Sequence, residues 1–538
     1  MNKYAIGMIA AMVAHIAPAL GNEGQTDQIL VKFINSSASA RTLKEQDILS
    51  LRSGLSSLGF NASFVRSLGS GVHVIKLDRF APVQVLNKGL TVLAKARADI
   101  SFFEPDLIGL PATSDTYFAA QWNLHSPAAG ANLPLAWQYS TGSGVVIGIV
   151  DTGLSFHEDL YGKTVQGYDF ISDTNSSNDG DGRDEDAQDP GSRRSAGQCP
   201  SPFQSALASD WHGTMVASVA AAGTDNNLGI AGVAPFARLQ SIRVIGACGA
   251  YSSDVADGIQ WTSGAPVSGI PQNASPAKVI NVSISGDGSC PSVFHSAIAS
   301  ARSQGSVVVV GAGNKNIDVA NSWPANCAGV IAVAATNSVG QRWVAGTSGS
   351  NFGSGVTLSA PGEDIWVATN SGTTTPGADS YAMRSGTSLA APMISGVAAL
   401  MRSVNPDLTP DDVALILKGT SRPFPAGCVG CGAGILDASA AVGAVRAGAQ
   451  QGTFTQTYIT RGSNTSTLVL TNSGSGWITG IVATCTAPGS SITTSPPSAL
   501  APGQSATIHS SNSWFTYTCG FNVTARNVTN GPYQNSGF

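Results

Sequence analysis

Three residues that lie far apart in the sequence have the side chains of a serine nucleophile and its proton relay. Ser388 lies in SGTSLAAPMISGVAAL (385–400), where an almost entirely apolar helix must begin. The free N–H groups and the dipole at a helix start stabilise a developing anion. A serine at this position often only caps the helix, and a nucleophile also needs a base.

His212 and Asp151 supply the base and the group that orients it. His212 begins the small-residue helix of DWHGTMVASVAAAG (210–223), and Asp151 directly follows the apolar run GVVIGIV (144–150). The other six histidines have no comparable surroundings. His212 would take the proton of Ser388 as general base, while Asp151 would hold the imidazole in one tautomer. The three residues therefore predict acyl-transfer chemistry.

Asn314 is the candidate for stabilising the tetrahedral intermediate of that reaction. It ends the motif GAGN (311–314), which closes another apolar run. Its side-chain amide would donate one hydrogen bond to the oxyanion, and the backbone N–H of Ser388 would donate a second. Loss of one such donor costs on the order of 3 kcal/mol.

A parallel sheet is the element that must position these residues. Between about 116 and 449 the apolar runs are continuous rather than alternating, as strands covered on both faces require. Helix patterns over 252–261 and 292–305 alternate with them. This predicts a three-layer α/β sandwich with its site at the carboxyl ends of the strands. The runs are GVVIGIVD (144–151), AKVINVSIS (277–285), SVVVVGAGN (306–314) and GVIAVAA (329–335).

The motifs D-T-G, H-G-T, A-G-N and G-T-S-L-A-A-P, in this order, resemble those of the subtilisin-like serine proteases, the subtilases. They contain Asp151, His212, Asn314 and Ser388, and the resemblance covers roughly residues 116–449. It implies a subtilisin-like fold with a mainly parallel central sheet. It also implies a secreted serine endopeptidase that acts through an Asp-His-Ser triad, an acyl-enzyme and an oxyanion hole that includes Asn314.

The resemblance also implies where substrate binds. In subtilases an extended substrate backbone pairs with two exposed strands, which correspond here to 249–251 and 283–285. The primary specificity pocket would be walled by these residues and by 311–313, with Ser322 near its base. No acidic residue is evident there, so an apolar or broad preference is expected. The expected substrate-binding residues are Gly249, Ala250, Tyr251, Ser283, Ile284, Ser285, Gly311, Ala312, Gly313 and Ser322.

Calcium is a further implication of the resemblance. The segment TDNNLGIAGVAP (224–235) matches the family's calcium loop, although Glu158 replaces the usual proline of the family's His-Pro-Asp-Leu motif. The expected ligands are the side chains of Asp159 and Asn226 and the carbonyl groups of Thr224, Leu228 and Ile230. A second stretch, 178–191, is dense in carboxylates. It is either a further site for a hard cation or a solvated acidic loop.

Composition limits the classes of partner. The chain has 538 residues, a formal net charge of −5 and 11% charged residues, against an average near 25%. More than one domain is expected at this length. There is no basic footprint for nucleic acid or an anionic membrane, and a monomer is expected. The eight cysteines favour disulfides in an exported protein, with Cys428 and Cys431 forming a tight loop rather than half of a zinc or redox motif.

Four regions are expected along the chain. Residues 1–21 resemble a secretory signal peptide, because the apolar stretch is short and ends in small residues; no membrane span is expected. The second region is 22–113, in which residues 28 to about 106 read as strand, helix, strand, helix, strand. The resemblance implies that it is a propeptide, an intramolecular chaperone and inhibitor that is cleaved near 111–116. The catalytic domain would cover 114–449. Residues 450–538 form short β-rich segments, predicting a small all-β domain held by Cys485 and Cys519.

Two other functions compete with the protease hypothesis. D-T-G is also the signature of aspartic proteases, but that mechanism needs a second carboxylate site or a dimer and leaves His212 and Ser388 without a role. A catalytically inactive scaffold that binds a surface or a carbohydrate is the non-enzymatic alternative. The intact set of Asp151, His212, Asn314 and Ser388 argues against it.

Overall fold

The computed structural model divides into two compact units, Met1–Pro111 and Ala112–Phe538, which are described separately. The predicted signal peptide and residues 111–112 of the predicted cleavage segment lie outside the described residues. The structure describes residues 25–34, 45–68, 70–106, 113–425, 427–448, 454–461, 465–472, 478–485, 490–494, 499–500, 504–512, 521–526 and 533–534.

The first unit is an α+β module. Two helices, α2 (Glu45–Ser57) and α3 (Val83–Lys95), pack with a four-stranded antiparallel sheet of order β2-β3-β1-β4. Its strands are β1 (Gln25–Phe33), β2 (Ala62–Ser67), β3 (Val72–Pro82) and β4 (Ile100–Pro105). The sequence predicted three strands here, and the sheet has four, because β2 was missed. This edge strand alternates half-buried and exposed residues and lacks a continuous apolar run.

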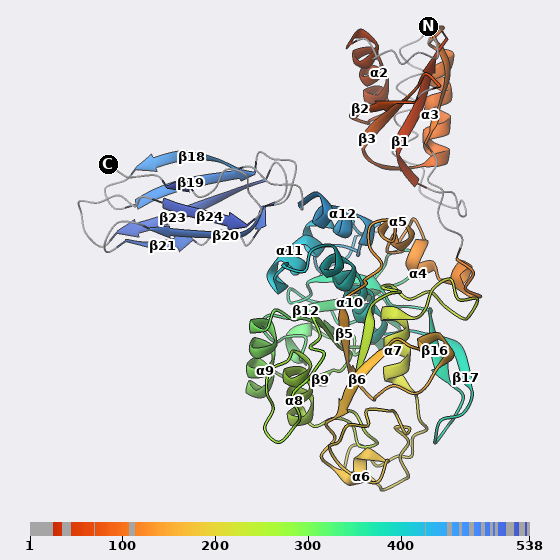
Figure 1. The fold of residues 1–538 in the computed structure, drawn as a ribbon, viewed down its shortest axis with the longest axis vertical. Helices are drawn as coiled ribbons and strands as arrows, with labels where there is room; N and C mark the ends of the chain where they lie inside the picture. Colours follow the sequence, from red (N-terminus) through yellow and green to blue (C-terminus); the bar gives the residue numbers. More distant parts are fainter. Residues whose placement is uncertain are drawn as a thin grey trace. The chain divides into compact units, whose positions relative to one another are not determined.

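The second unit is built on a seven-stranded sheet of order β15-β12-β10-β8-β5-β7-β6, and every strand pair in it is parallel (Figure 1). This arrangement confirms the predicted α/β sandwich with a parallel sheet. The strands are β5 (Val146–Asp151), β6 (Thr164–Asp169), β7 (Arg238–Arg243), β8 (Val279–Val282), β10 (Val307–Gly311), β12 (Ile331–Thr336) and β15 (Leu358–Pro361).

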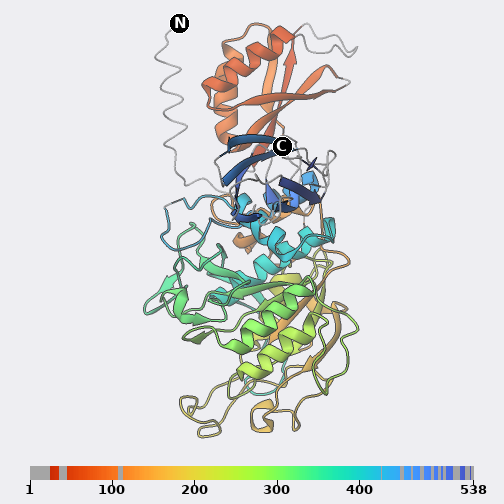
Figure 2. The same cartoon turned by 90° about the vertical axis from the view of Figure 1, so that its left-hand side faces the viewer.

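Both faces of this sheet are buried, which explains the continuous apolar runs. In β10, Val307 and Val309 pack toward α7 (His212–Ala221) and α10 (Thr387–Val404). The alternate residues of the same strand face α8 (Ser252–Thr262) and α9 (Ser292–Ser303). Helices α8 and α9 lie side by side in both views (Figures 1 and 2). Because successive side chains of a strand point to opposite faces of the sheet, the residues that face each layer of helices must be apolar.

Shorter elements complete the catalytic part of the unit. Helices α11 (Pro410–Thr420) and α12 (Ala438–Gly448) follow α10. Three antiparallel pairs are β9 (Gly286–Asp287) with β11 (Ser322–Trp323), β13 (Val344–Ala345) with β14 (Ser348–Gly349), and β16 (Ile365–Asn370) with β17 (Asp379–Arg384). Single turns are α4 (Trp122–His125), α5 (Leu133–Ala136), α6 (Thr174–Ser177), η1 (Phe118–Ala120), η2 (Glu158–Leu160) and η3 (Val319–Asn321).

The C-terminal part is all-β, as predicted, and its described strands form two four-stranded sheets. One has the order β18-β19-β23-β21 and the other β22-β20-β24-β25. The predicted link between Cys485 and Cys519 lies outside what the structure describes. The strands are β18 (Phe454–Arg461), β19 (Thr465–Asn472), β20 (Ile478–Cys485), β21 (Ser490–Thr494), β22 (Ala499–Leu500), β23 (Ser505–Asn512), β24 (Phe521–Arg526) and β25 (Tyr533–Gln534).

Three disulfides are present among the described residues. Cys428 pairs with Cys431, as the tight-loop hypothesis predicted. The other two, Cys199–Cys248 and Cys290–Cys327, close loops of 49 and 37 residues. In the described part of the chain, the one helix long and apolar enough to cross a membrane is α10, and 83% of its most apolar window is buried inside the protein.

Candidate active site

The carboxyl ends of three neighbouring strands bring the predicted residues together. Asp151 is the last residue of β5, Ser283 directly follows β8, and Asn314 lies three residues beyond the end of β10. These strands are adjacent in the order β10-β8-β5, so their ends lie at one edge of the sheet. The start of α10, with Ser388, reaches the same edge, because Ser388 contacts Ser283.

Asp151 and His212 form a close pair. His212 Nδ1 lies 2.7 Å from Asp151 Oδ1; Asp151 is fully buried, whereas 24% of the His212 side chain is exposed. Burial alone would lower the pKa of His212. The charge of Asp151 and the hydrogen bond to it, assisted by Asp210 and Asp189, instead raise that pKa to about 9. With Nδ1 held by the carboxylate, Nε2 is left to accept a proton.

The position of Ser388 depends on a proline inside its helix. Pro392 has no N–H, so the carbonyl of Ser388, four residues earlier, cannot make its helical hydrogen bond. Ser283 Oγ donates to that carbonyl instead, at 3.0 Å. The Ser388 hydroxyl in turn lies 3.5 Å from the carbonyl oxygen of Ser283, which makes it a long and weak donor. Ser283 therefore fixes the backbone that carries Ser388.

Asn314 is oriented by the residue that precedes Ser388. Its Oδ1 accepts hydrogen bonds from the backbone N–H and from Oγ1 of Thr387, both at 2.9 Å. Thr387 Oγ1 also accepts from the N–H of Gly313 at 3.1 Å. Because the oxygen is occupied, the amide nitrogen Nδ2 is the free end, and it faces the backbone of Gly386. An oriented N–H donor at this point has the chemistry of an oxyanion hole.

Of the two segments expected to bind substrate, 283–285 lies at this site through Ser283, and neither segment is paired as a strand. Residues 249–251 precede α8, with a single bridge from Gly246 to Gly249, and Tyr251 is 56% exposed. Residues 283–285 connect β8 to β9. Neither segment is a strand in the chain alone, and their pairing with an extended substrate stays a prediction. A strand assignment needs a ladder of hydrogen-bonded neighbours, and the structure describes only the single bridge at Gly249 for these two segments.

The residues expected to wall the primary pocket lie close together. Gly311 ends β10, Ala312 is fully buried, and Gly313 has a φ of +102°. A methyl group on Gly313 would lie 2.8 Å from Ser322 Oγ and 2.4 Å from Asn351 Nδ2. Only glycine fits there, both for its backbone conformation and for space.

The predicted calcium residues also converge. Asp159 is buried, and its two carboxylate oxygens accept from Asn226 Nδ2 at 2.8 Å and from the N–H of Ile230 at 2.9 Å. Asn226 Oδ1 accepts from the N–H of Leu228. Asp115, which the sequence did not single out, holds the N–H groups of residues 225 and 226. Burial raises the pKa of both Asp159 and Asp115.

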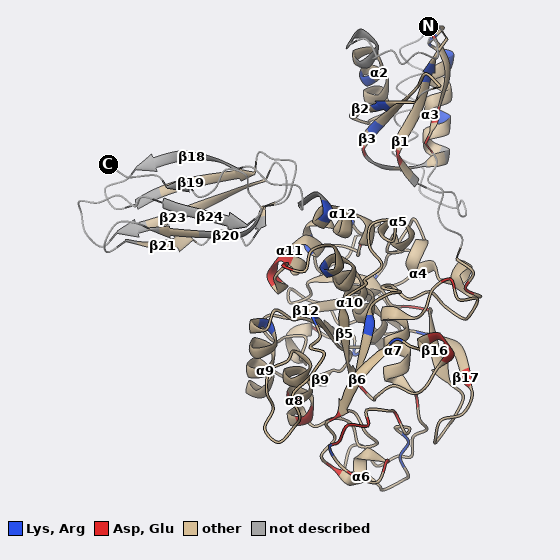
Figure 3. Cartoon of the chain, in the orientation of Figure 1, with Lys and Arg blue, Asp and Glu red and all other residues tan. Residues whose placement is uncertain are grey.

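The acidic segment 178–191 takes part in two groups of ion pairs, and acidic and basic residues are interspersed around α6 (Figure 3). Buried Arg243 pairs with Asp169 and Asp179. Arg183 pairs with Asp254 and Asp257 at 2.6 and 2.7 Å. No group of three His, Cys, Asp or Glu side chains suited to a metal occurs among the described residues. Asp179 and Arg183 of this segment are thus ion-paired, while its Asp181, Glu185 and Asp186 are exposed.

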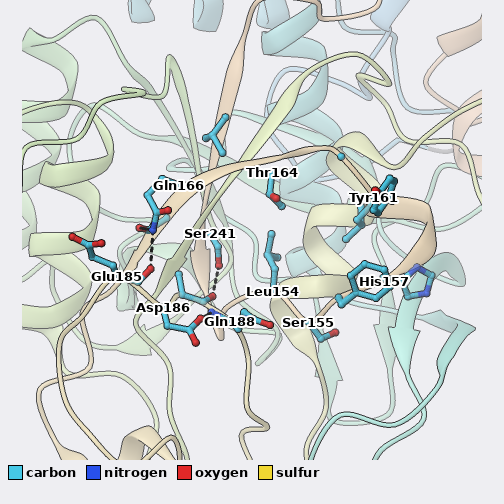
Figure 4. A pocket seen from close by; sticks show the side chains of 16 residues that line it. Leu154, Ser155, His157, Tyr161, Thr164, Gln166, Glu185, Asp186, Gln188 and Ser241 are labelled. Atoms are coloured by element: carbon cyan, nitrogen blue, oxygen red, sulfur yellow. Dashed lines mark hydrogen bonds between the residues drawn. The ribbon is translucent and has the colours of Figure 1, made fainter.

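A cavity of about 520 Å³, lined in part by residues of β6, is shown in Figure 4. Its lining comes from residues 154–157, 160–162, 164–167, 185–188 and Ser241, and includes neither Ser388 nor His212. Ser241 Oγ donates to the carbonyl of Ala187 at 2.7 Å, and Gln166 Nε2 to that of Glu185 at 2.8 Å. These bonds fix the segment that leads to Asp189.

Comparison with known proteins gives a consistent result. A model described as the subtilase family matches residues 142–452. An extracellular protease of Xanthomonas campestris pv. campestris is 47% identical over 393 residues, which cover 72% of this chain and 66% of that relative. An extracellular basic protease of Dichelobacter nodosus is 36% identical over 430 residues, covering 78% and 70% of the two chains. A solved protease structure from Pseudoalteromonas arctica PAMC 21717 is 48% identical with a TM-score of 0.60; it covers 62% of this chain and 99% of its own.

The fold and the site define the class of subtilisin-like serine proteases. The family match spans more than half of the chain, so the chain belongs to the subtilase family, and it is a serine endopeptidase. The family and the fold predicted from the sequence are confirmed. The aspartic-protease alternative is excluded by this membership, and Asp151 is bonded to a histidine.

Proposed function

We propose that the chain is a secreted endopeptidase in which Asp151, His212 and Ser388 form the catalytic triad. The observation that carries the proposal is the short contact between His212 Nδ1 and buried Asp151, which leaves Nε2 as the base. Ser388 then attacks the scissile carbonyl while His212 takes its proton. His212 returns that proton to the leaving amine, and water hydrolyses the acyl-enzyme by the same path.

Asn314 stabilises the two tetrahedral intermediates of this reaction. Its Nδ2 donates to the oxyanion, and the backbone N–H of Ser388, free at the start of α10, donates a second hydrogen bond. The fixed amide of Asn314 supports this role, because Thr387 occupies its oxygen and no reorientation is needed during the reaction.

Substrate binds in extended form between 249–251 and 283–285, adding the strand that these segments lack. The pocket formed by 311–313 and Ser322 accepts an apolar or unrestricted side chain. The support is the local composition: Gly311, Ala312, Gly313 and Ser322 bring no charge of their own. Protein substrates follow from the endopeptidase class.

Export and self-processing complete the proposal. The relatives from X. campestris and D. nodosus are named extracellular, and residues 1–21 have the pattern of a signal peptide. The α+β unit ahead of residue 112 acts as an inhibitory propeptide until the enzyme cleaves near 111–116. The mature domain extends to about residue 449, with the all-β region as a C-terminal extension.

Calcium fits the residues around Asp159. Apart from the amide nitrogen of Asn226, which donates to Asp159, the set offers oxygen ligands: the Asp159 carboxylate, the Asn226 amide oxygen, and the carbonyls of Thr224, Leu228 and Ile230. Burial raises the pKa of both Asp159 and Asp115, the charge of Asp159 adds to the rise at Asp115, and a divalent cation would offset this cost. Such an ion supplies structural cross-linking of the loop and takes no part in the reaction.

The test is intact mass and casein hydrolysis for the wild type beside Ser388→Ala, both expressed from residue 22. We expect the wild type to shorten near residue 112 and to digest casein, while the variant keeps its full length and is inactive. Equal lengths with no cleavage by either protein would contradict self-processing and favour the binding-scaffold alternative.

A further inference from the structure

A buried carboxylate that the proposed triad does not use lies behind His212. Asp189 is 2% exposed. Its Oδ2 accepts a hydrogen bond from Thr152 Oγ1 at 2.7 Å, and its Oδ1 accepts from the N–H of Gly191 at 2.8 Å. Burying a charge is costly unless it is hydrogen-bonded, and here both oxygens are engaged. A carboxylate that is buried next to the site despite the free-energy cost of desolvation is a candidate for a functional role.

Thr152 links the two residues of the proton relay. Its N–H donates to Asp151 Oδ1 at 2.8 Å, the same oxygen that contacts His212. Its hydroxyl oxygen accepts from the N–H of Gly213 at 3.0 Å. Helix α7 begins at His212, and its N-cap residue Trp211 provides no side-chain cap. The hydroxyl of Thr152 therefore caps the helix that carries His212, from outside the helix.

Asp189 determines which way this hydroxyl points. A carboxylate can only accept, so the hydroxyl proton must be directed at Asp189, and a lone pair is left for the N–H of Gly213. Without the carboxylate the hydroxyl could rotate and lose the cap. Hydrogen bonds to an ionised acceptor are about twice as strong as neutral ones, which favours the single orientation.

The charge of Asp189 also acts on the imidazole. The charged groups that act on His212 are Asp151, Asp210 and Asp189, and all three raise its pKa. Burial raises the pKa of Asp189 itself to about 6, against the hydrogen bonds from Thr152 and Gly191 and the charge of Arg243; Asp210 adds to the rise. Above that pH, Asp189 is a second anion behind His212.

We propose that Asp189 is a positioning residue for His212, which orients the Thr152 hydroxyl as the cap of α7 and stabilises the imidazolium from behind. The proposal rests on the proposed function, because it needs His212 to be the general base.

The test is the pH profile of kcat/KM, with kcat and KM separated, on a neutral tetrapeptide p-nitroanilide. Active sites are counted by titration with a fluorophosphonate, so that only folded, mature enzyme enters kcat. Asp189→Asn removes the charge but keeps an acceptor for Thr152. We expect the acid limb of its kcat/KM profile to shift to a pH about 0.5 unit lower than in the wild type. The loss of an anion lowers the pKa of His212, and the neutral imidazole is the active form. The matched control is Asp186→Asn, an exposed carboxylate three residues earlier, whose profile should coincide with the wild type.

A second pair of variants tests the hydroxyl and remains decisive if Asp189→Asn does not mature. Thr152→Val should lower kcat about tenfold with KM within about twofold, while Thr152→Ser restores the wild-type value. The proposal is overturned if Asp189→Asn and Asp186→Asn give the same acid limb, or if Val and Ser at position 152 behave alike. A wild type that neither reacts with the fluorophosphonate nor hydrolyses the peptide would instead overturn the proposed function.

Discussion

Replacing Asn314 separates the two tasks that its side chain performs. Its Nδ2 is the proposed oxyanion donor, whereas its Oδ1 caps the start of α10 through the N–H of Thr387 at 2.9 Å. Asn314→Ala removes both. Loss of one oxyanion donor costs about 3 kcal/mol, and at 1.36 kcal/mol per tenfold kcat falls by about two orders of magnitude. Loss of the cap costs about 1 kcal/mol of stability.

Asn314→Asp is the matched variant, because its carboxylate still accepts from Thr387 but cannot donate to an oxyanion. We expect kcat to fall at least as far as in Asn314→Ala, while the thermal midpoint stays near the wild-type value. The assay is steady-state hydrolysis of a tetrapeptide p-nitroanilide per titrated active site, beside thermal unfolding of the fluorophosphonate-inhibited proteins. Activity of Asn314→Asp within fivefold of the wild type would refute the oxyanion assignment.

Four further outcomes follow from the structure. Asp151→Asn should lower kcat about 10⁴-fold by favouring the wrong tautomer of His212, measured by burst and steady-state kinetics. Because the pKa of His212 is raised to about 9 in the folded protein, kcat/KM should rise as the pH rises through 9. The ion pair of His212 with Asp151 should stabilise the folded protein fully below pH 6.5, and this stability should be lost as the pH rises from 6.5 to 9. The urea midpoint of Ser388→Ala, measured across this range, checks the second expectation. Opening the 49-residue loop with Cys199→Ser and Cys248→Ser should cost up to about 4 kcal/mol in the same urea assay, and an unchanged midpoint would contradict this. A calcium chelator should lower the thermal midpoint of the inhibited wild type but not that of Asp159→Asn.

The fold could be predicted from the sequence because burial on both faces of a parallel sheet forces continuous apolar runs. The runs ending at Asp151, Ser285 and Asn314 mark three adjacent strands, so the sequence also indicated which residues meet. Strand β2 was missed for the converse reason: at the edge of its sheet, only one face needs apolar residues.

The predicted reacting groups lie in local motifs, which is why the sequence indicated them. The residues that orient these groups, in contrast, are brought to them by contacts between distant segments of the chain. Thr152 and Asp189 are 37 residues apart, and Asn314 and Thr387 are 73 apart. The threonines stand inside the motifs D-T-G and G-T-S, next to the predicted Asp151 and Ser388, and that adjacency is the one signal that could have found them. Asp189 is one of several carboxylates in the acidic stretch 178–191, and no local signal distinguishes it from the others.

The pairing of four cysteines was open for the same reason. Spacing alone does not distinguish Cys199–Cys248 from other combinations, because each pair closes only once the strands are in register. Cys428 and Cys431 are the exception, since their separation of three leaves few other partners within reach.

The most direct test of the account is the site of covalent labelling by a fluorophosphonate. The wild-type protein is labelled, digested and analysed by mass spectrometry, beside Ser388→Ala and His212→Ala. The account predicts one phosphonylated residue, Ser388, with no adduct in Ser388→Ala and much slower labelling in His212→Ala. Labelling at another serine, or equal rates for the wild type and His212→Ala, would contradict the assignment of Ser388 as a nucleophile activated by His212.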